Sequence, residues 1–318
     1  MFLSKHLFHS ASKEPAELVR AELFSIERLE QHAESLAQAQ RITRKRFKGR
    51  TILGRVRDNS RALSSAHHRI TQNIRDERAI TPAAEWFVDN FHVIEEQILE
   101  IQDDLPPKFY RGLPKLKEGP LKGTPRVYGV AWAFVAHTDS RFDPDWLRRF
   151  VRAYQRVDPL TIGELWALAI SLRIVLIENL RRLVDRLLHS KAERLKADTL
   201  ADSLLGLKGR PPADFGETLR HFEKQVLDKS FAVQLVLRLR DQGESMAPVM
   251  QWLDKQLGAQ ETVADDIIRM EHQEQAAMNA TARNIITSMR LVSALDWAQF
   301  FEDVSVVDEI LRDENRFS

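Results

Sequence analysis

Apolar residues recur at steps of three and four along most of this chain, and this spacing is the strongest constraint on its fold. It places them on one face of an amphipathic helix, as in the stripes Leu18, Leu23, Ile26, Leu29, Ala33, Leu36 and Leu53, Val56, Leu63, Ile70, Ile74. Strict alternation, which is typical of strands, extends over no more than four residues. The sequence predicts an all-α fold: a multi-helix bundle with long amphipathic helices, two helical lobes and no substantial β-sheet.

Proline and glycine mark where these helices begin and where they are interrupted. Thr81 before Pro82 and Asp143 before Pro144 each combine a capping residue with a proline suited to the first helical turn. Residues 105–125 hold five of the chain's twelve prolines and predict an irregular loop, and residues 206–216 form a second break. We therefore expect an N-terminal lobe of residues 1–205 and a C-terminal lobe of residues 217–318, joined as one continuous helical module.

The composition is that of a soluble protein with a packed core. Hydrophobic residues make up 43% of the chain and charged residues 29%, and the net charge is only +1, so no global field favours nucleic acid. Cysteine is absent, which excludes disulfides and thiolate chemistry. The most apolar stretch, residues 165–177, is shorter than the roughly 20 residues that a membrane-spanning helix needs. We expect it to be the most buried helix, and the chain to be soluble on its own.

Metal and catalytic motifs are weak throughout the sequence. A carboxylate-bridged di-iron site needs Glu-x-x-His on two helices, and only Asp89 and His92 approach that pattern. Asp143-Pro144-Asp145 matches the Asp-x-Asp pattern of many glycosyltransferases, but it lies between predicted helices, where helix capping explains it. No glycine-rich phosphate loop, nucleophile elbow or kinase motif occurs. The sequence assigns no catalytic residue, metal ligand or cofactor site.

A basic run covers residues 41–50, "RITRKRFKGR", with six basic residues in ten. The favoured interpretation is a solvated helix end. The alternative is contact with anionic lipid headgroups, which attract such runs.

The aromatic stretch from Tyr128 to Trp146 is the candidate site. Tyr128 and Trp132 are four residues apart, so they share a helix face, and the small residues beside them favour a packed core. Polar residues follow at the helix end, and aromatic faces beside fixed polar groups also suit sugar rings. The alternative is therefore a carbohydrate- or partner-facing site made of Tyr128, Trp132, His137, Asp139 and Arg141, together with Trp86, Asp89 and Glu164 from neighbouring helices.

Several long segments, in order, resemble the N-terminal region of bacterial cyclic β-1,2-glucan synthases. They include "AITPAAEWFVDNFHVIEEQI", "PRVYGVAWAFVAHTDSRFD", "LTIGELWALAISLRIVLIENLRRL" and "NIITSMRLVSALDWAQFFEDVSVVDEIL", and the resemblance runs from about residue 18 to residue 312. It implies a very large inner-membrane protein of Gram-negative bacteria that builds cyclic β-1,2-glucan from UDP-glucose with a divalent metal. The family's membrane helices and glycosyltransferase domain follow the matched region, so no catalytic residue is carried over.

The resemblance leads to a main hypothesis and two alternatives. The main one is a non-catalytic N-terminal helical segment, without a cofactor of its own, on the cytoplasmic side of the inner membrane. Its expected partners are the downstream synthase domains, glucan, and an anionic membrane surface through residues 41–50, but not nucleic acid. One alternative is a stand-alone helical carbohydrate-active enzyme that uses paired carboxylates such as Asp89, Glu96, Asp139 and Glu164. The other is an adaptor that binds only protein or membrane surface.

Overall fold

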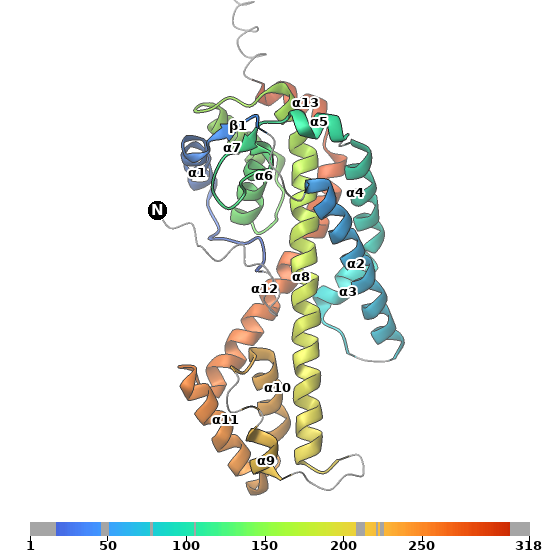
Figure 1. Cartoon of the computed structure of the whole chain (residues 1–318), viewed down its shortest axis with the longest axis vertical. Coiled ribbons are helices and arrows are strands. Elements are labelled where there is room, and N and C mark those ends of the chain that lie inside the picture. The colour runs from blue at the N-terminus through green and yellow to red at the C-terminus, as the bar shows by residue number, and fades with distance from the viewer. Residues whose placement is uncertain are drawn as a thin grey trace, which may run out of the picture. The chain divides into compact units, whose positions relative to one another are not determined.

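Helices account for most of the chain in the computed structural model, which describes residues 17–45, 51–76, 79–104, 106–207, 214–220, 222 and 226–305. These residues form thirteen α-helices, one short 3-10 helix and a two-stranded sheet (Figure 1). The two predicted caps are confirmed: the Thr81 hydroxyl accepts the backbone N–H of Ala84 at 3.3 Å, and the Asp143 carboxylate accepts that of Asp145 at 2.9 Å. The predicted all-α class is confirmed.

The chain groups into two compact units that differ from the predicted lobes. Of the described residues, those within 17–184 and 280–305 form the first unit, and those within 185–279 form the second. The long helices α8 (Ile162–Leu204) and α12 (Ala264–Ala294) contribute to both. Residues 208–213 of the predicted break at 206–216 lie outside the described residues, while Leu204 before it and Leu219 after it belong to one hydrophobic cluster of the second unit.

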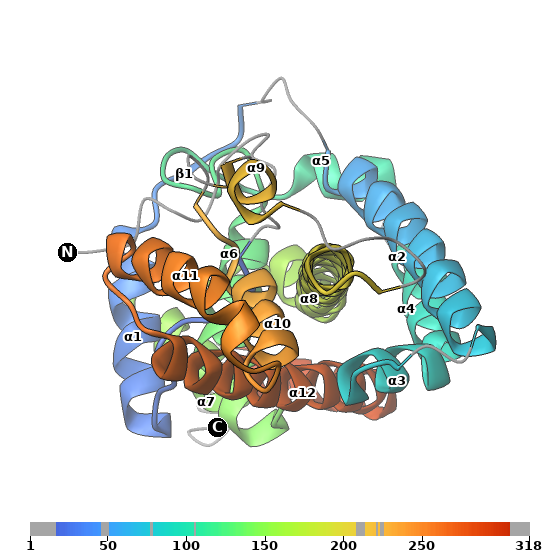
Figure 2. The same ribbon diagram turned by 90° about the horizontal axis from the view of Figure 1, so that it is seen from below.

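The first unit is built around α6 and the N-terminal part of α8. Figures 1 and 2 show α8 between a group formed by α2, α3 and α4 and a group formed by α1, α6 and α7. All side chains from 167 to 180 are buried, which confirms the prediction for this stretch, although Trp166 is exposed. The other helices of this unit are α1 (Ile26–Ala39), α2 (Ile52–Arg75), α3 (Pro82–Asp89), α4 (Phe91–Asp104), α5 (Pro107–Gly112), α6 (Arg126–His137), α7 (Pro144–Gln155) and α13 (Trp297–Val304).

The proline-rich connection between α4 and α6 is more ordered than the predicted irregular loop. It contains α5 and β2 (Lys115–Leu116), which pairs antiparallel with β1 (Ile42–Thr43). Gly129 lets α6 approach this small sheet, because a Cβ there would lie 2.9 Å from the side-chain amide of Gln40 and 3.0 Å from Leu116. Of the basic run, Arg41, Arg44 and Lys45 are exposed, and residues 46–50 lie outside the described residues.

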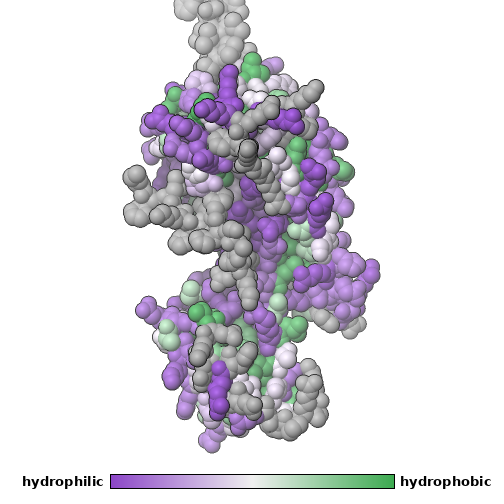
Figure 3. All heavy atoms as spheres, in the orientation of Figure 1, coloured by the Kyte–Doolittle hydropathy of each residue, from purple (hydrophilic) through white to green (hydrophobic). Residues whose placement is uncertain are grey.

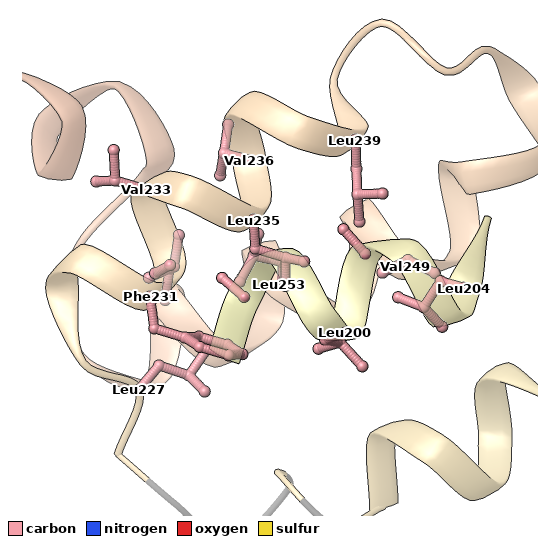
Figure 4. Packing of buried hydrophobic residues seen from close by; sticks show 14 of the residues in the cluster. Leu200, Leu204, Leu227, Phe231, Val233, Leu235, Val236, Leu239, Val249 and Leu253 are labelled. Atoms are coloured by element: carbon pink, nitrogen blue, oxygen red, sulfur yellow. The ribbon is translucent and has the colours of Figure 1, made fainter. Parts of the chain in front are cut away.

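The second unit has its own hydrophobic core. Figure 4 shows side chains of this cluster, among them Leu200 and Leu204 of α8 together with Leu235 and Leu253. Burying such a cluster stabilises the unit in proportion to the apolar area removed from water. Besides parts of α8 and α12, the unit contains α9 (Phe215–Arg220), α10 (Lys229–Leu239), the 3-10 helix η1 (Glu244–Met246) and α11 (Ala247–Ala259).

On the face seen in Figure 3, the described residues are mostly hydrophilic. Figure 3 shows hydrophilic side chains over most of the visible face, with hydrophobic ones in small patches. Within the described part of the chain, no helix combines the length and apolar character that crossing a membrane requires.

Candidate functional site

The two aromatic residues at the centre of the predicted site lie in the interior of the first unit. Tyr128 is 1% exposed and Trp132 is 7% exposed. Both are on α6, with ring centroids 5.9 Å apart. The guanidinium of Arg182 lies 5.0 Å from the centroid of the Trp132 ring, within cation–π range. In this structure, the two rings therefore contact protein groups.

The buried carboxylate of Glu178 on α8 accepts hydrogen bonds from the polar groups around Tyr128. The Tyr128 hydroxyl donates to Glu178 Oε2 at 3.1 Å. Arg182 Nη2 donates to Oε1 at 2.8 Å, and Arg55 Nη2 donates to the same oxygen. Because Arg55 comes from α2 and Tyr128 from α6, this cluster links three helices through charge-assisted hydrogen bonds.

The Glu178 cluster makes stability depend on pH. Burial raises the pKa of the Glu178 carboxyl, but the guanidinium groups of Arg55 and Arg182 outweigh burial and hold the pKa below its ordinary 4.5. A carboxyl with a lowered folded pKa stabilises the protein above its unfolded pKa, and this contribution is lost as the pH falls through the folded value. We expect Glu178→Gln to lower the free energy of unfolding at neutral pH, and the difference from wild type to narrow as the pH falls below about 4.5.

Urea denaturation at a series of pH values measures this difference. Glu96→Gln on α4 is the control, because Glu96 is exposed and its substitution should change stability little at any pH. A difference between wild type and Glu178→Gln that stays constant from about pH 7 to about pH 3 would show that the charge of Glu178 does not stabilise the fold.

The turn after α6 holds Asp139 and Ser140 in the left-handed backbone region, with φ of 49° and 61°. Such conformations are uncommon outside glycine and persist where surrounding contacts fix them. The Asp139 carboxylate accepts hydrogen bonds from Thr281 Oγ1 at 2.8 Å and Asn284 Nδ2 at 3.3 Å, both on α12. The Ser140 hydroxyl accepts one from Asn179 Nδ2 of α8 at 2.8 Å. The turn after α6 is therefore joined to α8 and α12 by side-chain hydrogen bonds.

The polar residues on either side of this turn differ in environment. His137 is half-buried; its ring stacks on Phe24 with centroids 3.9 Å apart, and its Nδ1 donates to the Glu22 backbone carbonyl at 2.7 Å. Burial lowers the pKa of His137 below its ordinary 6.5, which favours the neutral ring at neutral pH. Arg141 is exposed.

The remaining predicted site residues lie on other elements. Glu164, fully buried in the first turn of α8, accepts a hydrogen bond from Arg126 Nη2 at 2.6 Å. Trp86 is half-buried on α3, with the guanidinium of Arg283 5.9 Å from its ring centroid, and Asp89 is exposed at the end of the same helix. Glu164 and Trp86 therefore have partners different from those of the aromatic pair on α6.

A separate pocket lies in the first unit, with a volume of about 530 Å³. This volume is within the roughly 300–1,000 Å³ typical of small-molecule sites. Trp166 on α8 is 55% exposed, and its ring centroid lies 4.7 Å from that of Phe301 on α13. Trp297 is fixed by a hydrogen bond from its Nε1 to the Val292 carbonyl at 2.8 Å. The residues that line the pocket are Asp104, Pro106, Phe109, Trp166, Ala169, Ile170, Arg173, Trp297 and Phe301.

Two charged side chains stand among these aromatic walls. Arg173 is 7% exposed, and its Nε lies 2.8 Å from the Glu100 carboxylate, although the N–H is not aligned for a hydrogen bond. Asp104, at the end of α4, is exposed. The pocket thus combines flat apolar rings with a few polar groups, which is the usual composition of a ligand site.

Comparison with known proteins identifies a relative of this chain. No protein-family profile matches the sequence. The cyclic beta-(1,2)-glucan synthase NdvB of Rhizobium meliloti is 36% identical to this chain over 302 residues. The chain is similar to a cyclic beta-(1,2)-glucan synthase. This confirms the resemblance found in the sequence.

The match covers very different shares of the two proteins. It covers 94% of this chain but only 10% of the synthase, so the chain spans about a tenth of the length of its relative. Because so little of the chain lies outside the match, the similarity to the synthase includes residues of both compact units.

The four carboxylates proposed for an acid–base enzyme do not share one set of partners. Asp89 and Glu96 are exposed on α3 and α4, Asp139 is bound by α12, and Glu164 is paired with Arg126. In the part of the chain that the structure describes, no group of three or more His, Cys, Asp or Glu side chains is arranged to hold a metal ion.

Sequence reasoning missed the aromatic pocket. Trp297 and Phe301 carry a usable signal, because their four-residue spacing places both on one face of α13. Trp166 gave the opposite signal, since it lies in the stretch predicted to be most buried. Phe109 and Arg173 meet these residues only through the tertiary fold, which sequence spacing does not reveal.

Proposed function

We propose that this chain acts as a non-catalytic helical module of a cyclic β-1,2-glucan synthase. In this proposal the rest of the synthase transfers glucose from UDP-glucose, with a divalent metal, on the cytoplasmic side of the inner membrane. The module docks on the downstream synthase domains or organises the growing glucan. The 36% identity over 94% of the chain, set against 10% of the relative, supports this role of a part rather than of the whole.

The observation that carries the non-catalytic role is the number of acids in the pocket. Glycoside hydrolysis uses two carboxyl groups on opposite sides of the scissile bond. Asp104 is the one carboxylate among the described residues that line the pocket. Glu100, one turn earlier on α4, is 2.8 Å from Arg173 Nε and accepts a hydrogen bond from Ser293 Oγ at 3.2 Å, so its charge already has partners.

The buried carboxylates elsewhere in the first unit also support this role. Glu164 is bound by Arg126, and Glu178 by Arg55 and Arg182. A general acid at neutral pH needs a raised pKa, whereas the pKa of Glu178 is lowered by its arginine partners. These groups act as ion pairs that hold helices together.

The test is an assay of turnover by the purified chain. Incubated with UDP-glucose and Mg²⁺ or Mn²⁺, it should form no glucan, and incubated with linear β-1,2-glucan it should release no new reducing ends. Turnover that is lost in Asp104→Asn but kept in Asp103→Asn, its exposed neighbour on α4, would replace this proposal with an independent enzyme.

A further inference from the structure

We infer that the pocket defined by Trp166, Phe301, Trp297, Phe109, Arg173 and Asp104 binds a segment of linear β-linked glucan. The pocket lies in the first unit, and its lining residues come from the helices α4, α5, α8 and α13. This inference rests on the proposed function for its choice of glucose polymer. The geometry supports a carbohydrate independently of that choice.

Trp166 presents an exposed aromatic ring at the pocket. A tryptophan that is 55% exposed on an otherwise buried stretch of α8 leaves a large apolar ring in water. Its neighbour Phe301 is only 8% exposed, and the two rings meet at 54° with centroids 4.7 Å apart. Trp166 is therefore supported on one side by protein, while its solvent-facing surface is free to receive a flat apolar partner.

The second aromatic contact gives the pocket a second wall. The rings of Trp297 and Phe301 lie 5.8 Å apart at 35°, and the hydrogen bond from Trp297 Nε1 to the Val292 carbonyl fixes the indole. Rigid aromatic walls lose little side-chain freedom when a ligand binds, which favours affinity.

The polar groups decide which apolar ligand fits. Arg173 is nine-tenths buried, and the only ion-pair partner that the described residues give it is Glu100. Its buried Nε has no aligned hydrogen-bond acceptor. Asp104 adds a carboxylate acceptor. A wholly apolar ligand would make no hydrogen bonds to this guanidinium donor and this carboxylate acceptor. Vicinal hydroxyl groups can form hydrogen bonds with both.

β-Linked glucose has the matching chemistry. Its ring substituents are equatorial, so both faces of the ring present C–H groups to an aromatic surface while the hydroxyl groups point outward at the edge. One ring can stack on Trp166 while its hydroxyl groups reach Arg173 or Asp104. The pocket volume of about 530 Å³ and its opening to solvent suit part of a chain rather than an enclosed single sugar.

The experiment is a calorimetric titration of the full chain with a short linear β-1,2-gluco-oligosaccharide. We expect saturable binding that weakens about tenfold in Trp166→Ala and is largely kept in Trp166→Phe. Leu99→Ala is the matched control, because Leu99 is 59% exposed on α4 and is not among the pocket residues. An α-1,4-linked oligosaccharide of the same length should bind at least several-fold more weakly.

Three results would overturn the inference. One is the absence of saturable binding, and another is equal binding by wild type and Trp166→Ala. The third is a concentration-dependent dimer that is lost in Trp166→Ala, which would assign the pocket to a second copy of the chain. Urea denaturation of each variant checks that it is folded. Failure of binding leaves the turnover assay unchanged, so the two proposals fail separately.

Discussion

Replacing Arg126 with Met is expected to lower the free energy of unfolding by about 3–5 kcal/mol. Arg126 is 1% exposed and Glu164 is 0% exposed, and two hydrogen bonds of 2.8 and 2.6 Å join them. Arg126 also donates to the Pro159 carbonyl at 3.0 Å. Removing the guanidinium leaves the Glu164 carboxylate buried without its cation, which is far more unfavourable than losing an exposed pair.

The double variant Arg126→Met/Glu164→Leu separates the buried charge from the other roles of Glu164. Removing both partners should restore part of the stability, because no uncompensated charge remains. Recovery should be incomplete, since Glu164 Oε2 also accepts the backbone N–H of Thr161 at 2.9 Å. The Thr161 hydroxyl in turn accepts the N–H of Glu164 at 3.3 Å, which completes a capping box at the start of α8.

The control for this prediction is a similar pair on the surface. Arg149 on α7 makes two hydrogen bonds to Glu30 on α1, of 2.8 and 3.0 Å, but its side chain is 47% exposed. Because water screens such a pair, Arg149→Met should change the melting temperature little. Urea and thermal denaturation followed by far-ultraviolet circular dichroism measure all variants. Equal losses in Arg126→Met and Arg149→Met would contradict the role assigned to burial.

The elements that were predicted correctly are those set by residues close together in the sequence. The caps at Thr81 and Asp143 and the buried stretch after Trp166 follow from spacing along a single helix, and the structure has them where they were expected. The order within residues 105–125 was missed, because β2 becomes a strand only by pairing with β1, which lies more than 70 residues earlier.

The candidate site depends on longer-range contacts, and this limits what spacing predicts. The sequence offers Glu164 as a candidate acid for acid–base work, but it does not reveal the partner Arg126, which is 38 residues away. Asp139 likewise binds Thr281, 142 residues away. In both cases the partner lies on another helix, so burial and neutralisation emerge only when the helices pack. The glucan-facing role of these residues stays a prediction, and the packing of Tyr128 allows it to be tested.

Tyr128→Ala is expected to lower the free energy of unfolding by about 3–5 kcal/mol, because it empties the space of a ring that is 1% exposed. Trp166→Ala is the comparison, an aromatic-to-alanine change at a residue that is 55% exposed, and it should lower stability by about half as much or less, because part of that ring is already in water. Chemical denaturation measures both. A small effect of Tyr128→Ala would show that this ring does not belong to the core.

Tyr128→Phe separates the contribution of the ring to the free energy of unfolding from that of the hydroxyl group. Burial and the Glu178 carboxylate raise the pKa of Tyr128, so the phenol stays protonated and donates to Glu178. Glu178 keeps its two arginine partners in this variant, so the loss should be only about 1 kcal/mol. Titration of Tyr128→Phe with the β-1,2-gluco-oligosaccharide then tests the site. Unchanged binding would make Tyr128 a structural residue, whereas weakened binding in a stable variant would place the sugar at the α6 aromatics instead of at Trp166.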